Sequence, residues 1–397
     1  MKNTLFLLIC FLALLSANPA FSQPSARIAG GPYLQNVTED GFTVIWTTTT
    51  DAAAWVETAS DDGTHFYAAE RPKYYDSHLG RRRLSRQHRV RVSGLEPGKS
   101  YRYRIMQQAV LSDEGNKRVV LGEGYGSDIL KHAPYPVTTL SPDRNETEFW
   151  MVNDIHGRDS VFRLLVQDAP KQKPDFVCLN GDLLNSIESE VALFEGFLAS
   201  ASELLTPAGI PLVVTRGNHD GRGKFAPHWL DYFPTPTGES YYTFRRGPVF
   251  FVVLDGCEDK PDSDIRYYGL STADAYREQQ AQWLRGIVAG EEFRSAPYRI
   301  VLIHMPPNKG RGWHGELEIE RLFIPILNAS GIDLMLCGHY HRYQWIDDRS
   351  RGSDFPILIN SNNDKTVVRA DEKGIDIRIV NTAGNVLKEH KITKSNR

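Results

Sequence analysis

The segment EFWMVNDIHGRDS, residues 148–160, decides how the second half of the chain folds. The segment at residues 148–153 is short and rich in large apolar side chains, which is typical of a buried strand. Two residues that can bind metals, Asp154 and His156, follow this strand, and residues 160–168 have the pattern of a helix. A strand, a polar loop and a helix in this order are the repeating unit of α/β proteins.

The same unit recurs along the rest of the chain. Further buried strands are predicted at residues 175–180, 211–215, 249–254, 299–303 and 334–337. Helices are predicted at residues 190–205, 275–289 and 316–328. This alternation predicts an α/β domain.

Polar residues follow five of these strands. The five motifs are Asp154-Ile155-His156, Gly181-Asp182, Gly217-Asn218-His219-Asp220, His304 and Gly338-His339-Tyr340-His341. Because α/β sheets bind ligands at the carboxyl ends of their strands, we expect these side chains to meet. The neighbouring glycines allow the backbone to approach a bound ion closely.

The chemistry of these motifs indicates metal binding. Imidazole, carboxylate and amide oxygen without thiolate suit Zn, Fe or Mn. The candidate ligands are Asp154, His156, Asp182, Asn218, His304, His339 and His341. Seven ligands are too many for one tetrahedral ion, but they suit two ions that share a bridging carboxylate.

In order and spacing the motifs resemble those of the calcineurin-like metallophosphoesterases, D-x-H, G-D, G-N-H-[DE], H and G-H-x-H, from residue 149 to the C-terminus. The resemblance implies an α/β domain with two β-sheets sandwiched between helices. It implies one ion held by Asp154, His156, Asp182 and His341, and a second held by Asp182, Asn218, His304 and His339. It also implies hydrolysis of a phosphate ester by metal-activated hydroxide, with His219 protonating the leaving group and Asp220 orienting His219.

The region before residue 142 has a different pattern. Short runs rich in β-branched and aromatic residues, at 42–49, 54–59, 65–69, 88–92 and 101–106, predict an all-β sandwich. Residues 94–103, GLEPGKSYRY, resemble a corner of a fibronectin type III domain, in which the Tyr101 hydroxyl would bond upstream backbone.

This two-domain layout resembles the purple acid phosphatases, with a departure at the metal site. Those enzymes have a tyrosine at the position of Asn185 and lack the histidine found here as His156. We therefore expect no ferric-tyrosinate centre, and the pair of ions stays open among Fe, Zn, Mn and Mg.

The first residues have the features of a signal peptide. Lys2 precedes an apolar run at residues 5–15, and small residues precede a predicted cleavage before Gln23. The run is too short to span a bilayer, which needs about 20 residues, so we expect no transmembrane anchor after cleavage. The predicted division is a signal peptide at 1–22, a fibronectin type III-like β-sandwich at 23–142 and a metallophosphoesterase domain at 143–397. The mature protein is expected to be exported, either periplasmic or secreted.

Composition limits the other function classes. The 397 residues carry 46 Lys and Arg against 49 Asp and Glu, and this balance argues against nucleic-acid binding by charge neutralisation. Cys178, Cys257 and Cys337 lack metal-site spacing and are expected to be free thiols. The oligomeric state is not predictable from these features.

Substrate contacts are predicted close to the metal motifs. Arg158 and Arg216 flank two of the motifs, and Arg311 and His314 lie in the loop after His304. A salt-bridge or solvent-loop role is the structural alternative for each. The expected substrate is a small phosphate monoester. A diester or nucleotide is the alternative within this chemistry, and a non-catalytic binding or adhesion protein with a degenerate hydrolase domain is the alternative outside it.

Overall fold

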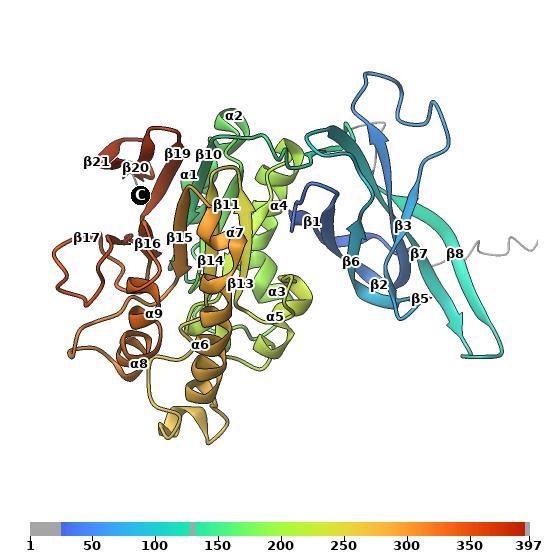
Figure 1. The fold of residues 1–397 in the computed structure, drawn as a ribbon. Helices are drawn as coiled ribbons and strands as arrows, with labels where there is room; N and C mark the ends of the chain where they lie inside the picture. Colours follow the sequence, from blue (N-terminus) through green and yellow to red (C-terminus); the bar gives the residue numbers. More distant parts are fainter. Residues whose placement is uncertain (1–24, 128–131, 394–397) are drawn as a thin grey trace, which may run out of the picture.

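The computed structural model describes residues 25–127 and 132–393, so the predicted signal peptide lies outside the described residues. An N-terminal part built of strands is followed by a larger α/β part, and Figure 1 shows the two side by side. Strand β10 begins the second part at Thr147, close to the predicted start of the metallophosphoesterase domain at residue 143. The domain limits themselves stay a prediction.

The N-terminal part is organised around one long strand. Its strands are β1 (Ile28–Gln35), β2 (Phe42–Ser60), β3 (Lys73–Tyr75), β4 (Ser77–His78), β5 (Arg81–Arg82), β6 (Leu84–Val92), β7 (Ser100–Asp113), β8 (Val119–Gly126) and β9 (Tyr135–Thr138). The first half of β2 pairs with β1 and β6, and its second half pairs with β3 and β7. Trp46, Val90 and Tyr103 lie in the core that these strands enclose.

Two details of this part bear on the predictions. The Tyr101 hydroxyl accepts a hydrogen bond from the Glu96 N–H at 2.9 Å, which confirms the predicted contact with upstream backbone. Residues 65–69 were expected to form a strand, and this prediction is wrong because they form a turn. In that segment Phe66 is buried while Tyr67 is exposed, and the polar residues before them form bends.

The α/β part contains two mixed sheets. Its strands are β10 (Thr147–Val152), β11 (Phe176–Asn180), β12 (Leu212–Thr215), β13 (Tyr242–Arg246), β14 (Val249–Leu254), β15 (Tyr298–Ile303), β16 (Leu334–Cys337), β17 (Gln344–Ile346), β18 (Ile357–Ile359), β19 (Asp364–Asp371), β20 (Gly374–Asn381) and β21 (Val386–Thr393). The order in one sheet is β21-β20-β19-β10-β11-β12, and it is β13-β14-β15-β16-β18-β17 in the other. In each sheet the central strands are parallel and an antiparallel strand lies beside them.

Helices cover the outer faces of both sheets. They are α1 (Asp159–Val166), α2 (Ala169–Gln172), α3 (Glu190–Leu193), α4 (Ala199–Leu205), α5 (Trp229–Tyr232), α6 (Ala273–Ala289), α7 (Glu291–Ser295), α8 (His314–Leu322) and α9 (Ile324–Asn328). A π-helical turn at Phe194–Leu198 joins α3 to α4, so the predicted helix at 190–205 is continuous. The predicted helix at 316–328 is instead two helices, since Pro325 lies in the first turn of α9.

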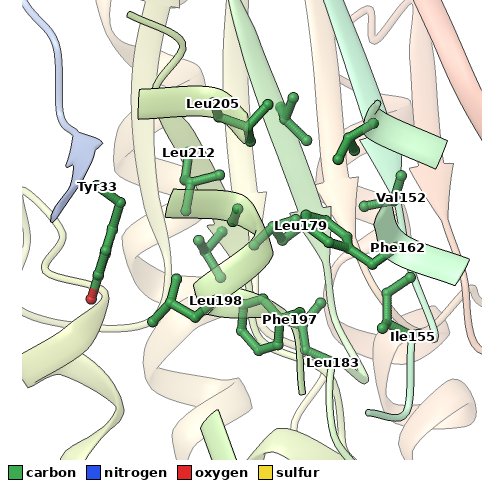
Figure 2. Close-up of a cluster of buried hydrophobic side chains, with 14 of the residues drawn as sticks. Tyr33, Val152, Ile155, Phe162, Leu179, Leu183, Phe197, Leu198, Leu205 and Leu212 are labelled. Carbon is green, nitrogen blue, oxygen red and sulfur yellow. The ribbon is translucent and has the colours of Figure 1, made fainter. Parts of the chain in front are cut away.

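Alternation along the strands explains the layers. In β10, Phe149 and Met151 face the other sheet, whereas Trp150 and Val152 face the helices. Phe149 stacks on Phe176 at 4.8 Å between ring centroids, within the core between the sheets. Figure 2 shows the outer core, in which Phe162 of α1 and Phe197 pack on the helix side. The predicted fold of two sheets between helices is therefore what the α/β part adopts.

The sheet of β10 continues into the N-terminal part through β1. Gln35 of β1 pairs with Leu212 of β12 in parallel. The buried hydroxyl of Tyr33 donates to the carbonyl oxygen of Tyr232 at 2.9 Å. The two parts therefore share both backbone pairing and a buried polar contact.

Cys178, Cys257 and Cys337 are buried and free, as the sequence predicts. Among the described residues, no helix has the length and apolar character needed to cross a membrane.

Candidate metal centre

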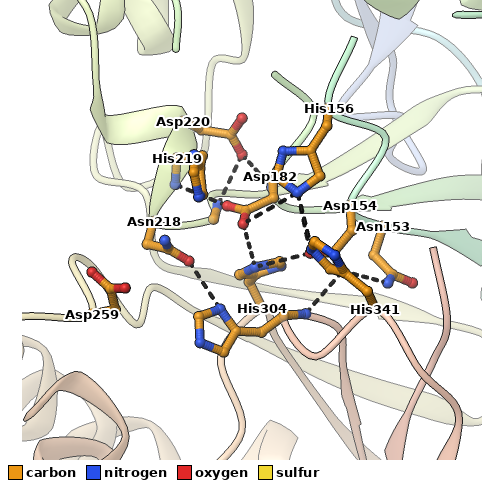
Figure 3. Close-up of polar contacts among 12 residues, drawn as sticks. Asn153, Asp154, His156, Asp182, Asn218, His219, Asp220, Asp259, His304 and His341 are labelled. Atoms are coloured by element: carbon orange, nitrogen blue, oxygen red, sulfur yellow. Dashed lines mark hydrogen bonds and ion pairs between the residues drawn. The ribbon is translucent and has the colours of Figure 1, made fainter. Parts of the chain in front are cut away.

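The carboxyl ends of β10, β11 and β12 meet those of β15 and β16, and the five sequence motifs come together there. Figure 3 shows the side chains converging from these strand ends. All seven predicted ligands are present in this cluster. Six of them form two groups able to hold an ion, Asp154 with His156 and His341, and Asp182 with His304 and His339, and Asn218 lies beside the second group.

Asp154 has one oxygen fixed by the protein and one directed into the centre. Its Oδ2 accepts hydrogen bonds from the Asn153 side chain at 2.7 Å and from the His339 N–H at 2.9 Å. Its Oδ1 is buried without a hydrogen-bond partner among the described residues. The Nε2 atoms of His341, His156 and His304 lie 3.0, 3.7 and 3.8 Å from this Oδ1.

Asp182 is held in the same way and lies between the two groups. Its Oδ1 accepts the His219 N–H at 2.9 Å. Its Oδ2 lies 3.1 Å from Nε2 of His304 in one group and 3.9 Å from Nε2 of His156 in the other. One carboxylate oxygen is therefore within reach of both groups, as a bridging ligand must be.

The imidazoles present their inner nitrogens to these oxygens. Nδ1 of His304 lies 2.8 Å from the Asn180 carbonyl oxygen, which fixes Nδ1 as the donor and leaves the buried Nε2 facing the centre. Nε2 of His156 and Nε2 of His341 are 3.1 Å apart. On the far side, Nδ1 of His339 lies 3.1 Å from Oδ1 of Asn218, which brings the predicted amide ligand beside the second group.

The backbone is strained at these positions. Five of the seven candidate ligands have positive φ, namely Asp154 at 51°, His156 at 50°, Asp182 at 53°, His339 at 73° and His341 at 56°. Non-glycine residues rarely adopt this region, and such outliers cluster at functional sites. The strain turns side chains from successive positions toward the same point.

Two glycines show how closely the loops pack around the carboxylates. A Cβ atom on Gly217 would lie 2.2 Å from Oδ1 of Asp182, and one on Gly338 would lie 2.6 Å from Oδ2 of Asp154. Neither position has room for a side chain, which confirms the close backbone approach expected from the motifs.

The two carboxylates of the centre attract positive charge, which with no ion bound is a proton on His304 and which a metal ion would replace. Burial opposes ionisation of Asp154 and Asp182, but the positive charge of His304 keeps the pKa of both carboxyls below the ordinary range. Burial likewise opposes the charged form of His304, yet the two carboxylates raise the pKa of its imidazole to about 10. Burial, and then the charge of His304, lower the pKa of His339 to about 4, so His339 is neutral and able to act as a ligand.

These observations fit two metal ions. Neighbouring imidazole nitrogens and carboxylate oxygens lie only 3–4 Å apart, while buried Oδ1 of Asp154 and Nε2 of His304 have no hydrogen-bond partner in the part of the chain that the structure describes. Buried polar atoms are normally satisfied, so their convergence without hydrogen bonds indicates a site for a cation. The donor set, imidazole, carboxylate and amide oxygen, suits Fe, Zn or Mn.

His219 lies at the edge of the centre with a defined orientation. Its Nδ1 is 2.9 Å from the Asn185 carbonyl oxygen, and its ring is 5.0 Å from that of His156 between centroids. Asn185, at the position where a purple acid phosphatase has tyrosine, thus contributes its backbone to this site.

The expected role of Asp220 needs correction. Its buried carboxylate accepts the N–H groups of Asp182 at 2.8 Å, Gly217 at 2.9 Å and Leu183 at 3.0 Å, rather than contacting the His219 ring. Burial, and then the charge of Asp182, raise the pKa of Asp220 to about 7. Asp220 points back into the fold because three backbone donors there need an acceptor.

Two functional candidates were missed from the sequence. The Asn153 side chain holds Oδ2 of Asp154 in place by a hydrogen bond. Its position one residue before that ligand is the sequence feature that could have identified it. The guanidinium of Arg222 lies 3.2 Å from Nε2 of His219 and is held by Glu258 at 2.7 Å and Asp259 at 3.0 Å. Arg222 follows the Gly217–Asp220 motif closely, which is the signal that could have identified it.

The predicted substrate contacts divide into two kinds. Arg158 donates to the carbonyl oxygens of Asp154 and Asn362, Arg216 pairs with buried Asp255 at 2.7 Å, and His314 pairs with Asp274 at 2.8 Å. These contacts favour the structural alternative for all three side chains, because their donors are engaged by the protein.

Arg311 differs from these three. It lines an open polar pocket together with Tyr340, the residue between His339 and His341.

Comparisons with known proteins agree with this site. Residues 147–343 match the family model described as calcineurin-like phosphoesterase. The chain is 26% identical to the serine/threonine-protein phosphatase CPPED1 of Pongo abelii over 179 residues, 43% of this chain and 54% of that protein. It is 27% identical to purple acid phosphatase 18 of Arabidopsis thaliana over 160 residues, 37% of this chain and 33% of that protein.

The chain therefore spans about half or less of the length of these curated relatives. Among solved structures, a dimetal phosphatase from Danio rerio superposes with a TM-score of 0.47 at 14% identity, covering 63% of this chain and 99% of that one. With five motifs at the strand ends and a matching family model, residues 147–343 form a calcineurin-like phosphoesterase domain.

Proposed function

We propose that the protein is an exported phosphatase that hydrolyses phosphate monoesters with two metal ions. One observation carries this proposal. The atoms that could bind a metal form two groups, and Oδ2 of Asp182 is within reach of both. The other polar atoms of three ligands, Oδ2 of Asp154, Oδ1 of Asp182 and Nδ1 of His304, are held by hydrogen bonds to the protein.

The ligands divide between the ions as the geometry suggests. Asp154, His156 and His341 would hold one ion, and His304, His339 and Asn218 would hold the other, with Asp182 shared. When bound, two such ions supply a water nucleophile of lowered pKa and neutralise charge on the phosphoryl group.

The side chains of the protein would perform the remaining steps. Water oxygen forms the new bond to phosphorus while the bond from phosphorus to the leaving oxygen breaks, and that oxygen requires a proton. His219 is placed to donate it as the imidazolium, because Nδ1–H donates to the Asn185 carbonyl and Nε2 can carry the transferable proton once the Arg222 guanidinium, 3.2 Å from Nε2, turns to a phosphate oxygen. Arg222 lies beside Nε2, where its guanidinium can bind a phosphate oxygen without leaving Glu258.

The names of the relatives support a monoester substrate, since both are phosphatases.

The N-terminal part at residues 23–142 is proposed to be a fibronectin type III-like domain, and the Tyr101 contact supports this. Export is proposed from residues 1–22, and N-terminal sequencing of protein recovered outside the cytoplasm should then begin at Gln23. Recovery of protein that still begins at Met1 in the cytoplasm would contradict export.

The central test measures metal content and turnover together. Protein purified without chelator is assayed on p-nitrophenyl phosphate and on bis-p-nitrophenyl phosphate. We expect about two ions per chain, as in two-metal sites, and faster hydrolysis of the monoester. Faster hydrolysis of the diester would replace the monoester proposal, and no turnover with either ester would refute the enzyme proposal.

Variants assign the roles within this test. His219→Ala should lower kcat by about 10²–10⁴-fold with metal content unchanged, whereas Asp182→Asn should lower both. His228→Ala is the matched control, because His228 is exposed and its ring forms an ion pair with exposed Asp231 and contacts Phe225, away from the candidate ligands. Equal losses in His219→Ala and His228→Ala would contradict the proposed role of His219.

A further inference from the structure

An open pocket of about 380 Å³ lies beside the metal centre. It is lined by Asn308, Arg311, Trp313, Tyr340, Arg342 and Arg351. This volume is within the range of small-molecule sites, about 300–1,000 Å³. The pocket is therefore large enough for a chemical group of a bound small molecule.

The pocket and the metal centre share a wall. Tyr340 and Arg342 alternate in sequence with the candidate ligands His339 and His341. Behind Tyr340, Oε1 of Glu316 lies 3.7 Å from Nε2 of His339 and accepts the Tyr340 hydroxyl at 2.5 Å. The pocket is therefore within reach of the organic part of a molecule whose phosphate occupies the centre.

Three guanidinium groups give the pocket a positive character. Arg311, Arg342 and Arg351 form no ion pair with any carboxylate among residues 25–127 and 132–393. Arg351 is oriented by neutral groups, the Tyr340 hydroxyl at 3.3 Å and the Gln344 side-chain oxygen at 3.2 Å. Unpaired arginines that converge on a pocket are suited to a bidentate anion such as phosphate or carboxylate.

One carboxylate also lines the pocket, and its charge is already engaged. Glu316 is buried and accepts the Trp313 N–H at 2.9 Å and the Asn308 side chain at 3.2 Å, in addition to the Tyr340 hydroxyl. These bonds fix the loop that carries Arg311. Three positive charges against one engaged negative charge leave the pocket cationic.

We propose that this pocket binds a second anionic group of the substrate, so that the natural substrate is a small phosphate ester bearing a further phosphoryl or carboxylate group. Arg311, Arg342 and Arg351 bind that group, and the exposed ring of Trp313 borders the organic part between the two anions. This inference rests on the proposed phosphatase function and specifies its substrate class.

The test uses three series of esters of graded chain length on the metal-loaded full protein. The series are α,ω-alkanediol monophosphates, the matching bisphosphates, and ω-hydroxy acid phosphates that carry a carboxylate. At one preferred length we expect the doubly anionic ester to exceed the monophosphate in kcat/KM by about 10- to 100-fold, the effect of one or two charge-assisted hydrogen bonds. Preference for the bisphosphate or for the carboxylate series identifies the second group.

The variant Arg311→Gln/Arg342→Gln should reduce this ratio to the statistical factor for two equivalent ester groups in the bisphosphate series, and should abolish the preference in the carboxylate series. Both side chains are exposed, so the substitutions leave the core intact. Arg349→Gln is the matched control, because Arg349 is exposed and pairs with Asp354 outside the pocket, and it should keep the ratio of the unaltered protein.

Two failures are distinguishable. Hydrolysis of all three series at any length, with no preference for a doubly anionic ester beyond the statistical factor of the bisphosphates, would overturn the pocket proposal and leave the phosphatase function standing. A preference that survives the double substitution would also overturn it. No turnover with any ester would overturn the proposed function and the pocket proposal with it.

Discussion

The substitution Asp220→Asn separates two roles that the sequence alone cannot distinguish. If Asp220 orients His219, the substitution lowers the rate of proton transfer and leaves the fold intact. In the structure its Oδ2 accepts the N–H groups of Asp182 and Gly217, and its Oδ1 accepts that of Leu183. We therefore expect the substitution to act on the stability and metal affinity of these loops.

The magnitude follows from the hydrogen bonds that asparagine cannot make. Its single oxygen can replace Oδ1 or Oδ2, and in the first case the amide group faces the donors of Asp182 and Gly217. Two lost bonds to a charged acceptor cost about 1.5–3 kcal/mol each. Removal of a buried charge offsets part of this cost, so unfolding should become easier by about 2–4 kcal/mol.

Denaturant unfolding of the metal-free proteins measures this loss without interference from bound ions. Metal titration should show weaker binding by about 10- to 100-fold, since Asp220 fixes the backbone that carries Asp182. His219→Ala is the comparison variant and should retain both stability and metal affinity. If Asp220→Asn unfolds at the same denaturant concentration as the unaltered protein and loses only kcat, the backbone role is refuted.

Three further predictions follow from other contacts. Gly217→Ala places a Cβ 2.2 Å from Oδ1 of Asp182, so metal affinity measured by titration should fall by about 10- to 100-fold; unchanged affinity would show that the loop can move. Tyr33→Phe leaves the buried carbonyl of Tyr232 without its donor, and should lower the free energy of unfolding by about 1–3 kcal/mol; no change would mean that water replaces the hydroxyl. Chelation should lower the melting temperature, because ions at 100 times their Kd stabilise by about 2.7 kcal/mol per site, and equal melting temperatures with and without chelator would contradict a site formed only in the folded state.

The sequence predicted the centre well because each candidate ligand follows a short apolar strand. Strands buried on both faces are near-continuous apolar runs, so their ends are visible as the first polar residue, as at Asn153, directly before Asp154, and at His304. The parallel arrangement then brings these ends together: six of the predicted side chains form the two groups, and Asn218 contacts His339 of the second group.

The partners of the ligands were less predictable because their contacts depend on tertiary structure. Arg158 follows a ligand motif closely and was expected to bind substrate, yet it donates to the carbonyl oxygen of Asn362, 204 positions away. His314 likewise pairs with Asp274 across two helices. Proximity to a motif in sequence does not reveal which protein acceptors compete for a side chain.

The last strand, β21, was missed for a different reason. In β21 the side chains from Val386 to Thr393 are mostly exposed, so the segment lacks the apolar run that identified the central strands. It pairs with β20 at the edge of the sheet, where backbone hydrogen bonds and not burial hold it in place. Edge strands of this kind give a weak signal in any single sequence.

The strained backbone at the ligands lowers the stability of the strand-end loops when no ion is bound. Five ligands with positive φ cost about 1–3 kcal/mol each relative to ordinary backbone, and buried Asp154 and Asp182 repel one another at the same time. Backbone donors such as the His219 N–H hold these carboxylates from behind, but they do not remove the repulsion between the inner oxygens. A cation among those oxygens would remove it, so metal binding should stabilise the same loops that carry His219. The mechanism that we propose therefore couples local folding of the strand-end loops to metal binding, with the catalytic histidine ordered by the same event.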